Sequence, residues 1–227
     1  MINRFLCIVI FFACFMLGAE AQVNLKIGYE SALISSEQNK RVVNAFNELN
    51  RETLEQGMLL APLRLTHGLT IGVAYKRDFM RLSANWHSSS RRKVAFGEVP
   101  GTGDSFDRSI RHTVRGFSLQ YELIFGRFSL GVAPGRDNFR TTSLIGGTNN
   151  DLRIIDEDVF NVRFNLGFKL ITSNKASVYI EPYYTLLLDD VNHTGEYEFF
   201  DIPDIPSNVV DRPHYFGIQF TFHNGPQ

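Results

Sequence analysis

Apolar and polar residues alternate one by one over long stretches of this chain. Residues 159–170, Val-Phe-Asn-Val-Arg-Phe-Asn-Leu-Gly-Phe-Lys-Leu, are a clear example. A period of two indicates a β-strand with one apolar face and one polar face. Seven other segments share this period, so the pattern predicts eight strands, at 23–30, 69–76, 79–87, 114–125, 128–134, 159–170, 176–187 and 214–223.

The connections between these segments alternate in length. Those at 76–78, 126–127 and 172–175 are tight turns, whereas 31–68, 88–113, 135–158 and 188–213 are long. An even number of strands with short turns on one side and long loops on the other is typical of bacterial outer-membrane barrels. The pattern therefore predicts an all-β fold, an eight-stranded antiparallel up-and-down transmembrane β-barrel, with its turns in the periplasm and its loops outside.

The first long loop is predicted to contain one amphipathic helix at 37–56. Ser35 and Gln38 have the spacing of a capping box. The apolar residues that follow are three or four positions apart, and Gly57 suits the position just after a helix. The sequence does not place this helix relative to the barrel mouth.

The apolar face is predicted to point outward, because an eight-stranded barrel has an interior only wide enough for side chains. About five bulky apolar residues from each strand would overfill that interior, and overpacking is destabilising. Glycines also lie on the polar face of six strands, where a narrow interior needs room beside long side chains. They are Gly28, Gly72, Gly116, Gly131, Gly167 and Gly217.

This assignment places charged residues inside the barrel and aromatic residues near the strand ends. The predicted interior charge network is Lys26, Glu30, Arg81, Glu122, Arg163, Lys169 and Glu181. Buried charges must be paired, so Arg81 and Glu122, on neighbouring strands, are expected to form a salt bridge. Such a network leaves no wide pore. The predicted membrane-interface aromatics are Tyr29, Tyr75, Trp86, Phe125, Phe128 and Tyr184.

The N-terminus has the features of a secretory signal peptide over residues 1–21. Arg4 precedes a short apolar run, and Ala19-Glu20-Ala21 matches a cleavage sequence. Both cysteines lie in this segment, so the remaining barrel domain, 22–227, has no disulfide and no thiolate chemistry. The net charge of −1 argues against nucleic acid as a partner. No later segment is apolar enough for a transmembrane helix, so a membrane location requires a closed barrel.

The signal peptide, the eight segments and the last strand, Tyr-Phe-Gly-Ile-Gln-Phe-Thr-Phe at 215–222, resemble the small bacterial outer-membrane β-barrel family. That family includes the OmpA transmembrane domain and OmpX-like proteins, and the resemblance covers 22–227. It implies a monomer in contact with outer-membrane lipids and lipopolysaccharide, inserted by the barrel-assembly machinery. The family's terminal strand commonly ends in an aromatic residue, whereas here five residues follow Phe222.

Candidate chemistry is sparse. His87 and Ser88 are adjacent, but neighbours on a strand point to opposite faces, which disfavours a hydrolase pair. His67, His112 and His214 precede strands at the outer rim without metal-ligand spacing. The acidic loop 189–211 lacks the residue order of a calcium loop, and Arg91-Arg92-Lys93 suit lipopolysaccharide phosphates or that acidic loop. We expect no cofactor and no metal.

The sequence thus predicts a non-enzymatic outer-membrane barrel of a Gram-negative bacterium, with a structural role or a recognition role carried by long external loops that bind a surface or extracellular partner. Three alternatives stay open. One is a lipid-modifying enzyme, such as a lipid A acyl hydrolase or transferase. Another is a narrow channel or carrier for small solutes. The third is a soluble, lipocalin-like periplasmic binder.

Overall fold

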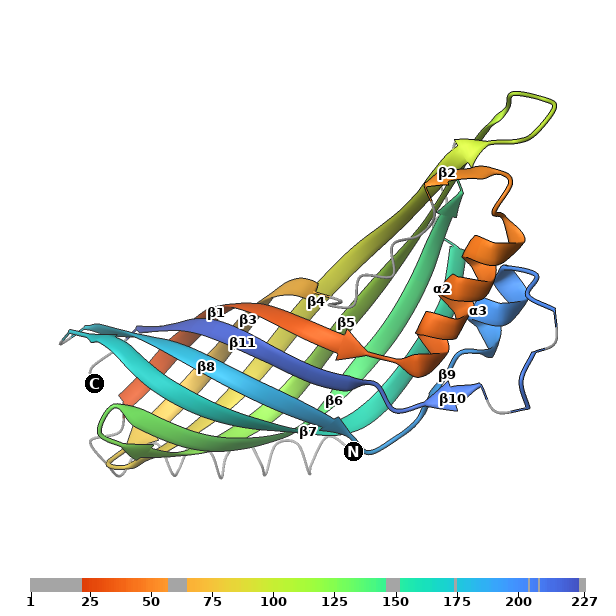
Figure 1. Cartoon of the computed structure of the whole chain (residues 1–227). Coiled ribbons are helices and arrows are strands. Elements are labelled where there is room, and N and C mark those ends of the chain that lie inside the picture. Colours follow the sequence, from red (N-terminus) through yellow and green to blue (C-terminus); the bar gives the residue numbers. More distant parts are fainter. Residues whose placement is uncertain are drawn as a thin grey trace, which may run out of the picture.

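The computed structural model describes residues 22–56, 65–145, 152–173, 175–203, 205–207 and 209–224. Within these residues, eight long antiparallel strands form one closed β-barrel (Figure 1). They are β1 (Gln22–Ser35), β3 (Leu65–Arg77), β4 (Met80–Glu98), β5 (Ser105–Phe125), β6 (Phe128–Ile145), β7 (Leu152–Thr172), β8 (Ala176–Leu187) and β11 (His214–Asn224). The pairing of β1 with β11 closes the ring. The predicted fold class is confirmed, and the predicted signal peptide lies outside the described residues.

The apolar faces of all eight strands point outward. Phe164 and Phe220 are each 48% exposed, whereas Gln219 is only 4% exposed. A soluble lipocalin-type barrel would have the opposite arrangement, with its phenylalanines inside. We call the outward side chains of this zone the apolar belt: Val23, Leu25, Ile27, Tyr29, Leu69, Ile71, Val73, Met80, Leu82, Phe117, Leu119, Tyr121, Phe128, Leu130, Val132, Phe160, Phe164, Leu166, Tyr184, Leu186, Phe216, Ile218, Phe220 and Phe222.

Strands β4 to β7 extend far beyond the apolar belt and form a curved wall on one side of the mouth (Figure 1). The predicted long loops 88–113 and 135–158 were therefore wrong in extent. β4 continues to Glu98 and pairs with β5 along the whole length. Beyond the belt the outward positions Ser88, Ser90 and Arg92 are polar, so the alternation of hydrophobicity disappears although the backbone pairing continues.

The predicted helix is present but shorter. Helix α2 spans Glu37–Leu49 instead of 37–56, and Asn50 caps its C-terminus. The chain then turns into the short strand β2 (Leu54–Gln56), which pairs with the end of β4. The N-cap is Ser36, whose side chain accepts a hydrogen bond from the Asn39 N–H at 3.0 Å. The predicted capping residue, Ser35, is instead the last residue of β1, and Gly57 lies outside the described residues.

The connection between β8 and β11 contains a second helix, α3 (Thr194–Phe199), and two short paired strands, β9 (Val191–Asn192) and β10 (Val210–Asp211). No helix among the described residues is both long and apolar enough to cross a bilayer.

Helices α2 and α3 lie together over the barrel mouth, against the inner side of the curved wall (Figure 1). We call them the helical cap. Val42, Val43 and Phe46 of α2 are buried, which is the spacing of one helix face. They share a hydrophobic core with Ala95 of β4, Ile110 of β5 and residues of α3. The ring of Phe46 meets the ring of Phe200 edge to face at 4.8 Å. The structure therefore places the helix on top of the barrel, a position that the sequence left open.

Candidate functional site at the barrel mouth

The residues of the predicted interior charge network lie on the inner face of the barrel. Six of them form three ion pairs, Lys26 with Glu181 at 3.1 Å, Arg81 with Glu122 at 2.7 Å and Arg163 with Glu30 at 3.3 Å. The salt bridge expected between Arg81 and Glu122 is thus present. Lys169 is half-buried, and its Nζ lies 5.7 Å from the centroid of the Tyr179 ring.

Further interior residues complete this network, and the sequence interpretation did not select them. Gln120 accepts a hydrogen bond from Lys26 at 3.1 Å. Tyr179 lies under the Arg81 guanidinium at 4.6 Å, and Tyr183 lies under Arg163 at 4.2 Å. His223 is fully buried beside Arg81. The sequence could have identified these residues from their position on the polar face of their strands. A buried tyrosine or histidine there is expected to have a polar neighbour.

One interior glycine shows how the network fits. A Cβ on Gly217 would collide with the ring of Tyr183, which is its direct neighbour across β8 and β11. Because Gly217 has no side chain, Tyr183 can lie flat beside Arg163. The interior is therefore filled by large side chains, and each ion pair offsets the cost of burying its two charges.

A second layer closes the barrel nearer its mouth. We call it the inner hydrophobic layer, because Val114, Phe139, Val159, Leu187 and Tyr215 form one buried cluster across several strands. The rings of Phe139 and Tyr215 stack with their centroids 5.6 Å apart. This layer lies between the ionic interior and the helical cap.

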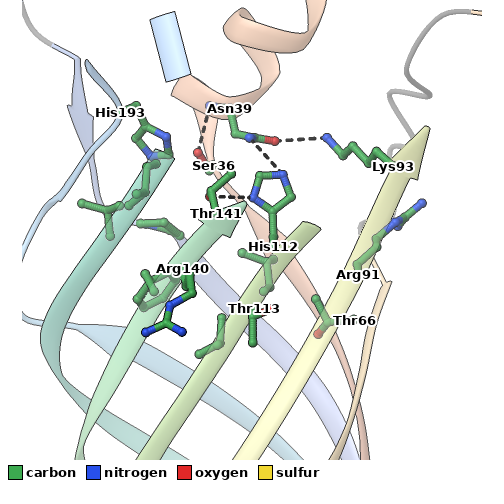
Figure 2. A pocket seen from close by; sticks show the side chains of 16 residues that line it. Ser36, Asn39, Thr66, Arg91, Lys93, His112, Thr113, Arg140, Thr141 and His193 are labelled. Atoms are coloured by element: carbon green, nitrogen blue, oxygen red, sulfur yellow. Dashed lines mark hydrogen bonds between the residues drawn. The ribbon is translucent and has the colours of Figure 1, made fainter. Parts of the chain in front are cut away.

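A cavity of about 60 Å³ lies between the inner hydrophobic layer and the helical cap. Figure 2 shows polar side chains from the N-terminus of α2 and from β4, β5 and β6 around it. His112 contacts Thr141 through Nδ1 at 3.1 Å and the Asn39 amide through Nε2 at 3.4 Å. Lys93 donates to the other side of Asn39 at 3.1 Å. The space suits a few water molecules, whereas pockets for small organic ligands are several times larger.

His193 joins the two ends of the last long connection to each other. Its Nδ1 lies 3.0 Å from Glu196 in α3, and its Nε2 lies 2.9 Å from Asp211 in β10. Asp211 also accepts hydrogen bonds from the Ser36 hydroxyl at 2.8 Å and the Gln38 N–H at 3.0 Å. This cluster, which we call the histidine clamp, therefore fastens α3 and β10 to the N-terminus of α2.

The charges of the histidine clamp follow from its geometry. Burial lowers the pKa of His193, but the hydrogen bonds with Asp211 and Glu196 outweigh it and raise the pKa to about 9. Burial opposes ionisation of Glu196 and Asp211, yet hydrogen bonds with His193 hold the pKa of each carboxyl below its usual value. At neutral pH the clamp is thus an imidazolium between two carboxylates.

The geometry does not assemble the candidate catalytic or metal residues. His87 points inward, with its Nε2 3.1 Å from Asp137, while Ser88 lies on the opposite face of β4. No group of three or more metal-ligating side chains occurs among the described residues. The three rim histidines have separate partners. His67 bonds to Tyr29 at 2.6 Å and His214 bonds to Tyr184 at 2.9 Å, both on the outer face of the barrel, whereas His112 contacts Asn39 of α2.

Four carboxylates of the acidic connection 189–211 have partners within the protein, whereas Glu198 and Asp201 are exposed. Asp189 accepts from the Phe160 N–H, Asp190 pairs with Arg212, and Glu196 and Asp211 hold His193. Asp204 lies outside the described residues.

The predicted interface aromatics lie at the two ends of the apolar belt. Tyr29 and Trp86 lie at the end nearer the helical cap, and Tyr184 lies one outward position below Leu186 at that end. Phe125 and Phe128 flank the tight turn after β5. Tyr75 is near the turn between β3 and β4, opposite Leu82.

Comparison with known proteins gives similarity in structure but not in sequence. No family model matches the chain, and no curated protein is similar to it in sequence. Neisserial surface protein A is similar in structure with a TM-score of 0.46 and 10% identity, covering 91% of this chain and 99% of that one. Ail of Yersinia pestis has a TM-score of 0.46 and 9% identity over the same shares of the two chains. OprG of Pseudomonas aeruginosa has a TM-score of 0.40 and 11% identity, covering 90% and 95%.

Proposed function

We propose that this chain is an exported barrel of the Gram-negative outer membrane that acts without enzymatic chemistry and presents its external half for recognition. The observation that carries the proposal is the continuous apolar belt around an ion-paired interior. Such a belt would be unfavourable in water on every strand at once, whereas acyl chains solvate it. The closed ring also leaves no unpaired strand edge in the hydrocarbon.

The interior argues for a closed barrel instead of a solute channel. Arg81 and Glu122 are at most 1% exposed, and the inner hydrophobic layer lies above them. A conducting pore would need a continuous aqueous path past both. We therefore propose that the membrane part serves as an anchor and that it conducts no ions.

The external half has the features of a recognition platform. Strands β4 to β7 hold a rigid wall beyond the belt, and the histidine clamp and the shared core of α2 and α3 fix the helical cap to it. Binding segments are usually carried by a rigid scaffold in this way. We propose that a partner molecule, either extracellular or on a cell surface, contacts the helical cap and the curved wall.

Fractionation of cells that express a tagged full chain tests the proposed location. The protein should appear in the outer-membrane fraction, require detergent for extraction and migrate faster before boiling than after boiling in a denaturing gel. Recovery in the soluble periplasmic fraction without detergent would contradict the proposal. Planar-bilayer recordings of the purified chain should show no discrete conductance steps, and regular steps would refute the closed interior.

Two further measurements address the remaining roles. The lipid A acylation profile of a deletion strain should equal that of the parent strain, since His87 and Ser88 point to opposite sides of the wall. A changed profile that the wild-type gene restores would indicate an enzyme.

Insertion is proposed to use the barrel-assembly machinery through β11, so truncation after Gly217 should abolish insertion into the membrane.

A further inference from the structure

The outer wall carries a basic groove just beyond the apolar belt. It has a volume of about 440 Å³ and spans β4, β5 and β6. Four serine or threonine residues and no acidic residue line it. Its other lining residues are five arginines: Arg91, Arg92, Arg111, Arg115 and Arg140. We call this feature the arginine groove. Three of its arginines, Arg92, Arg111 and Arg115, are exposed.

The strand register places two of these cations directly opposite each other. Arg92 of β4 and Arg111 of β5 are cross-strand partners. Arg115, four residues further along β5, lies on the same face and opposite Ser88. Like charges directly opposite each other on a sheet are destabilising. A bound anion would remove this repulsion, since planar guanidinium groups bind phosphate oxygens in pairs.

Arginines on the adjacent part of the same wall form ion pairs with carboxylates of the protein. Arg136 of β6 pairs with Asp158 of β7 at 2.7 Å, and Arg153 pairs with Asp156 within β7 at 2.6 Å. Arg140, on the β6 side of the groove, also pairs with Asp156, at 3.4 Å. Among the described residues, Arg92, Arg111 and Arg115 have no such carboxylate within salt-bridge distance. The protein thus neutralises the arginines next to β7, whereas Arg92, Arg111 and Arg115 of the groove are left for an external anion.

The depth of the groove indicates what kind of anion reaches it. Trp86 and Phe117 are cross-strand partners at the upper edge of the apolar belt, and the next outward pair along the same two strands is Ser88 with Arg115. Two residues along a strand correspond to about 7 Å. Arg115 therefore lies two residues along the strand above the hydrocarbon boundary, at the depth of lipid head groups.

We propose that the arginine groove binds the phosphate of a membrane lipid head group in the outer leaflet, whose acyl chains lie against the apolar belt of β4 to β6. Arg92, Arg111 and Arg115 contact the phosphate oxygens, and the serine and threonine hydroxyls of the groove are further donors. The assignment rests on the proposed membrane location, and it adds a defined ligand class to the external surface.

Trp86, the single tryptophan of the chain, provides the measurement. The purified protein is refolded in vesicles of phosphatidylcholine that contain either dibrominated phosphatidylcholine or dibrominated phosphatidic acid, both of which quench tryptophan fluorescence on contact. The relative quenching gives the preference of the Trp86 site for a phosphomonoester lipid. We expect a clear preference for phosphatidic acid in the wild-type chain, of about fivefold per contributing arginine.

Matched variants distinguish the effect of the groove arginines on the lipid preference from the effect of the protein's net charge. Arg92→Gln with Arg111→Gln should reduce the preference to about fivefold, the share of the remaining Arg115. Arg77→Gln with Arg127→Gln removes the same charge from exposed turns at the other end of the barrel and should leave the preference unchanged. An equal loss in both double variants would overturn the proposal, because it would show that the preference comes from overall charge.

The outcomes also separate this inference from the proposed function. If neither brominated lipid quenches Trp86, the belt is not in contact with acyl chains and the membrane location fails. If both lipids quench it equally, only the lipid site fails. Inorganic phosphate is added at constant ionic strength as a competitor. Loss of the lipid preference at low millimolar phosphate would assign the groove to a soluble anion and overturn the lipid assignment, whereas an unchanged preference supports it.

Discussion

Arg81 and Glu122 are direct cross-strand partners inside the barrel, and two hydrogen bonds of 2.7 and 2.8 Å join the guanidinium to the carboxylate. Both side chains are at most 1% exposed. Removing one partner of a buried pair leaves an uncompensated charge and typically costs about 3–5 kcal/mol. We therefore predict that Arg81→Met lowers the free energy of unfolding by about that amount, measured by urea unfolding of the protein refolded in lipid vesicles.

The exposed pair Arg136–Asp158 is the matched control, because its N–O distance is also 2.7 Å. Arg136→Met should cost about 0–1 kcal/mol, as for other surface pairs. The double variant Arg81→Met with Glu122→Leu should recover much of the lost stability, since apolar replacement of a whole buried pair is often neutral. Equal losses for Arg81→Met and Arg136→Met would contradict the assignment of a stabilising interior pair.

The start of α2 gives a second prediction, in which two adjacent serines are compared. Ser36 caps the helix by accepting from the Asn39 N–H and also donates to Asp211. Ser36→Ala should destabilise the cap by about 1–2 kcal/mol, seen as faster hydrogen exchange of the α2 amides. Ser35→Ala should leave the exchange unchanged, because Ser35 is exposed and belongs to β1. Faster exchange in Ser35→Ala alone would place the cap at the residue that the sequence pattern suggested.

The sequence predicted the barrel because the period of two depends only on local order. Within the belt, outward positions are uniformly apolar, so residues such as Phe160 and Phe164 mark their face without any knowledge of neighbouring strands. Beyond the belt this contrast is lost: Ser88, Ser90 and Arg92 resemble loop residues although they lie in β4. The strands there are specified by pairing with β5, which is a nonlocal property that no local pattern contains.

The sites were predictable to different degrees for the same reason. The interior charges could be assigned from the face they share with the glycines, and Arg81 with Glu122 could be paired from their similar distance to the turns. The histidine clamp could not, because His193 and Asp211 approach each other only after α3 and β10 fold over the mouth. The arginine groove likewise requires the register of Arg92 with Arg111.

Close packing inside the barrel gives a third prediction. Gly217→Ala would place a methyl group against the ring of Tyr183. Because the ring also lies against Arg163 at 4.2 Å, it cannot move without disturbing that contact, and we expect a loss of about 1–3 kcal/mol in the free energy of unfolding. Tyr183→Ala should be destabilising by itself, but Gly217→Ala should cost little when added to it. Additive losses in the double variant would exclude the proposed clash.

The histidine clamp predicts a cap whose stability depends on pH. The pKa of His193 is raised from 6.5 to about 9 in the folded protein, so its contribution is complete below about pH 6.5 and is lost as the pH rises through 9. The pKa values of Glu196 and Asp211 are lowered, so their contribution is complete above their ordinary values and is lost as the pH falls through the lowered ones. The cap should thus be most stable between about pH 5 and 6.5. The His193 part amounts to about 3 kcal/mol at most.

Limited proteolysis with subtilisin measures this dependence, with each rate normalised to cleavage of the unfolded chain at the same pH. In the wild type, cleavage within 189–213 should accelerate several-fold between pH 7 and pH 10, while the barrel strands stay resistant. His193→Gln removes the titrating group, so its cleavage should be faster at pH 7 and nearly independent of pH over this range. Lys93→Gln, beside the same cavity, keeps His193 and should retain the pH-dependent rise. If the wild type and His193→Gln show the same rise, another group controls the cap and the clamp does not.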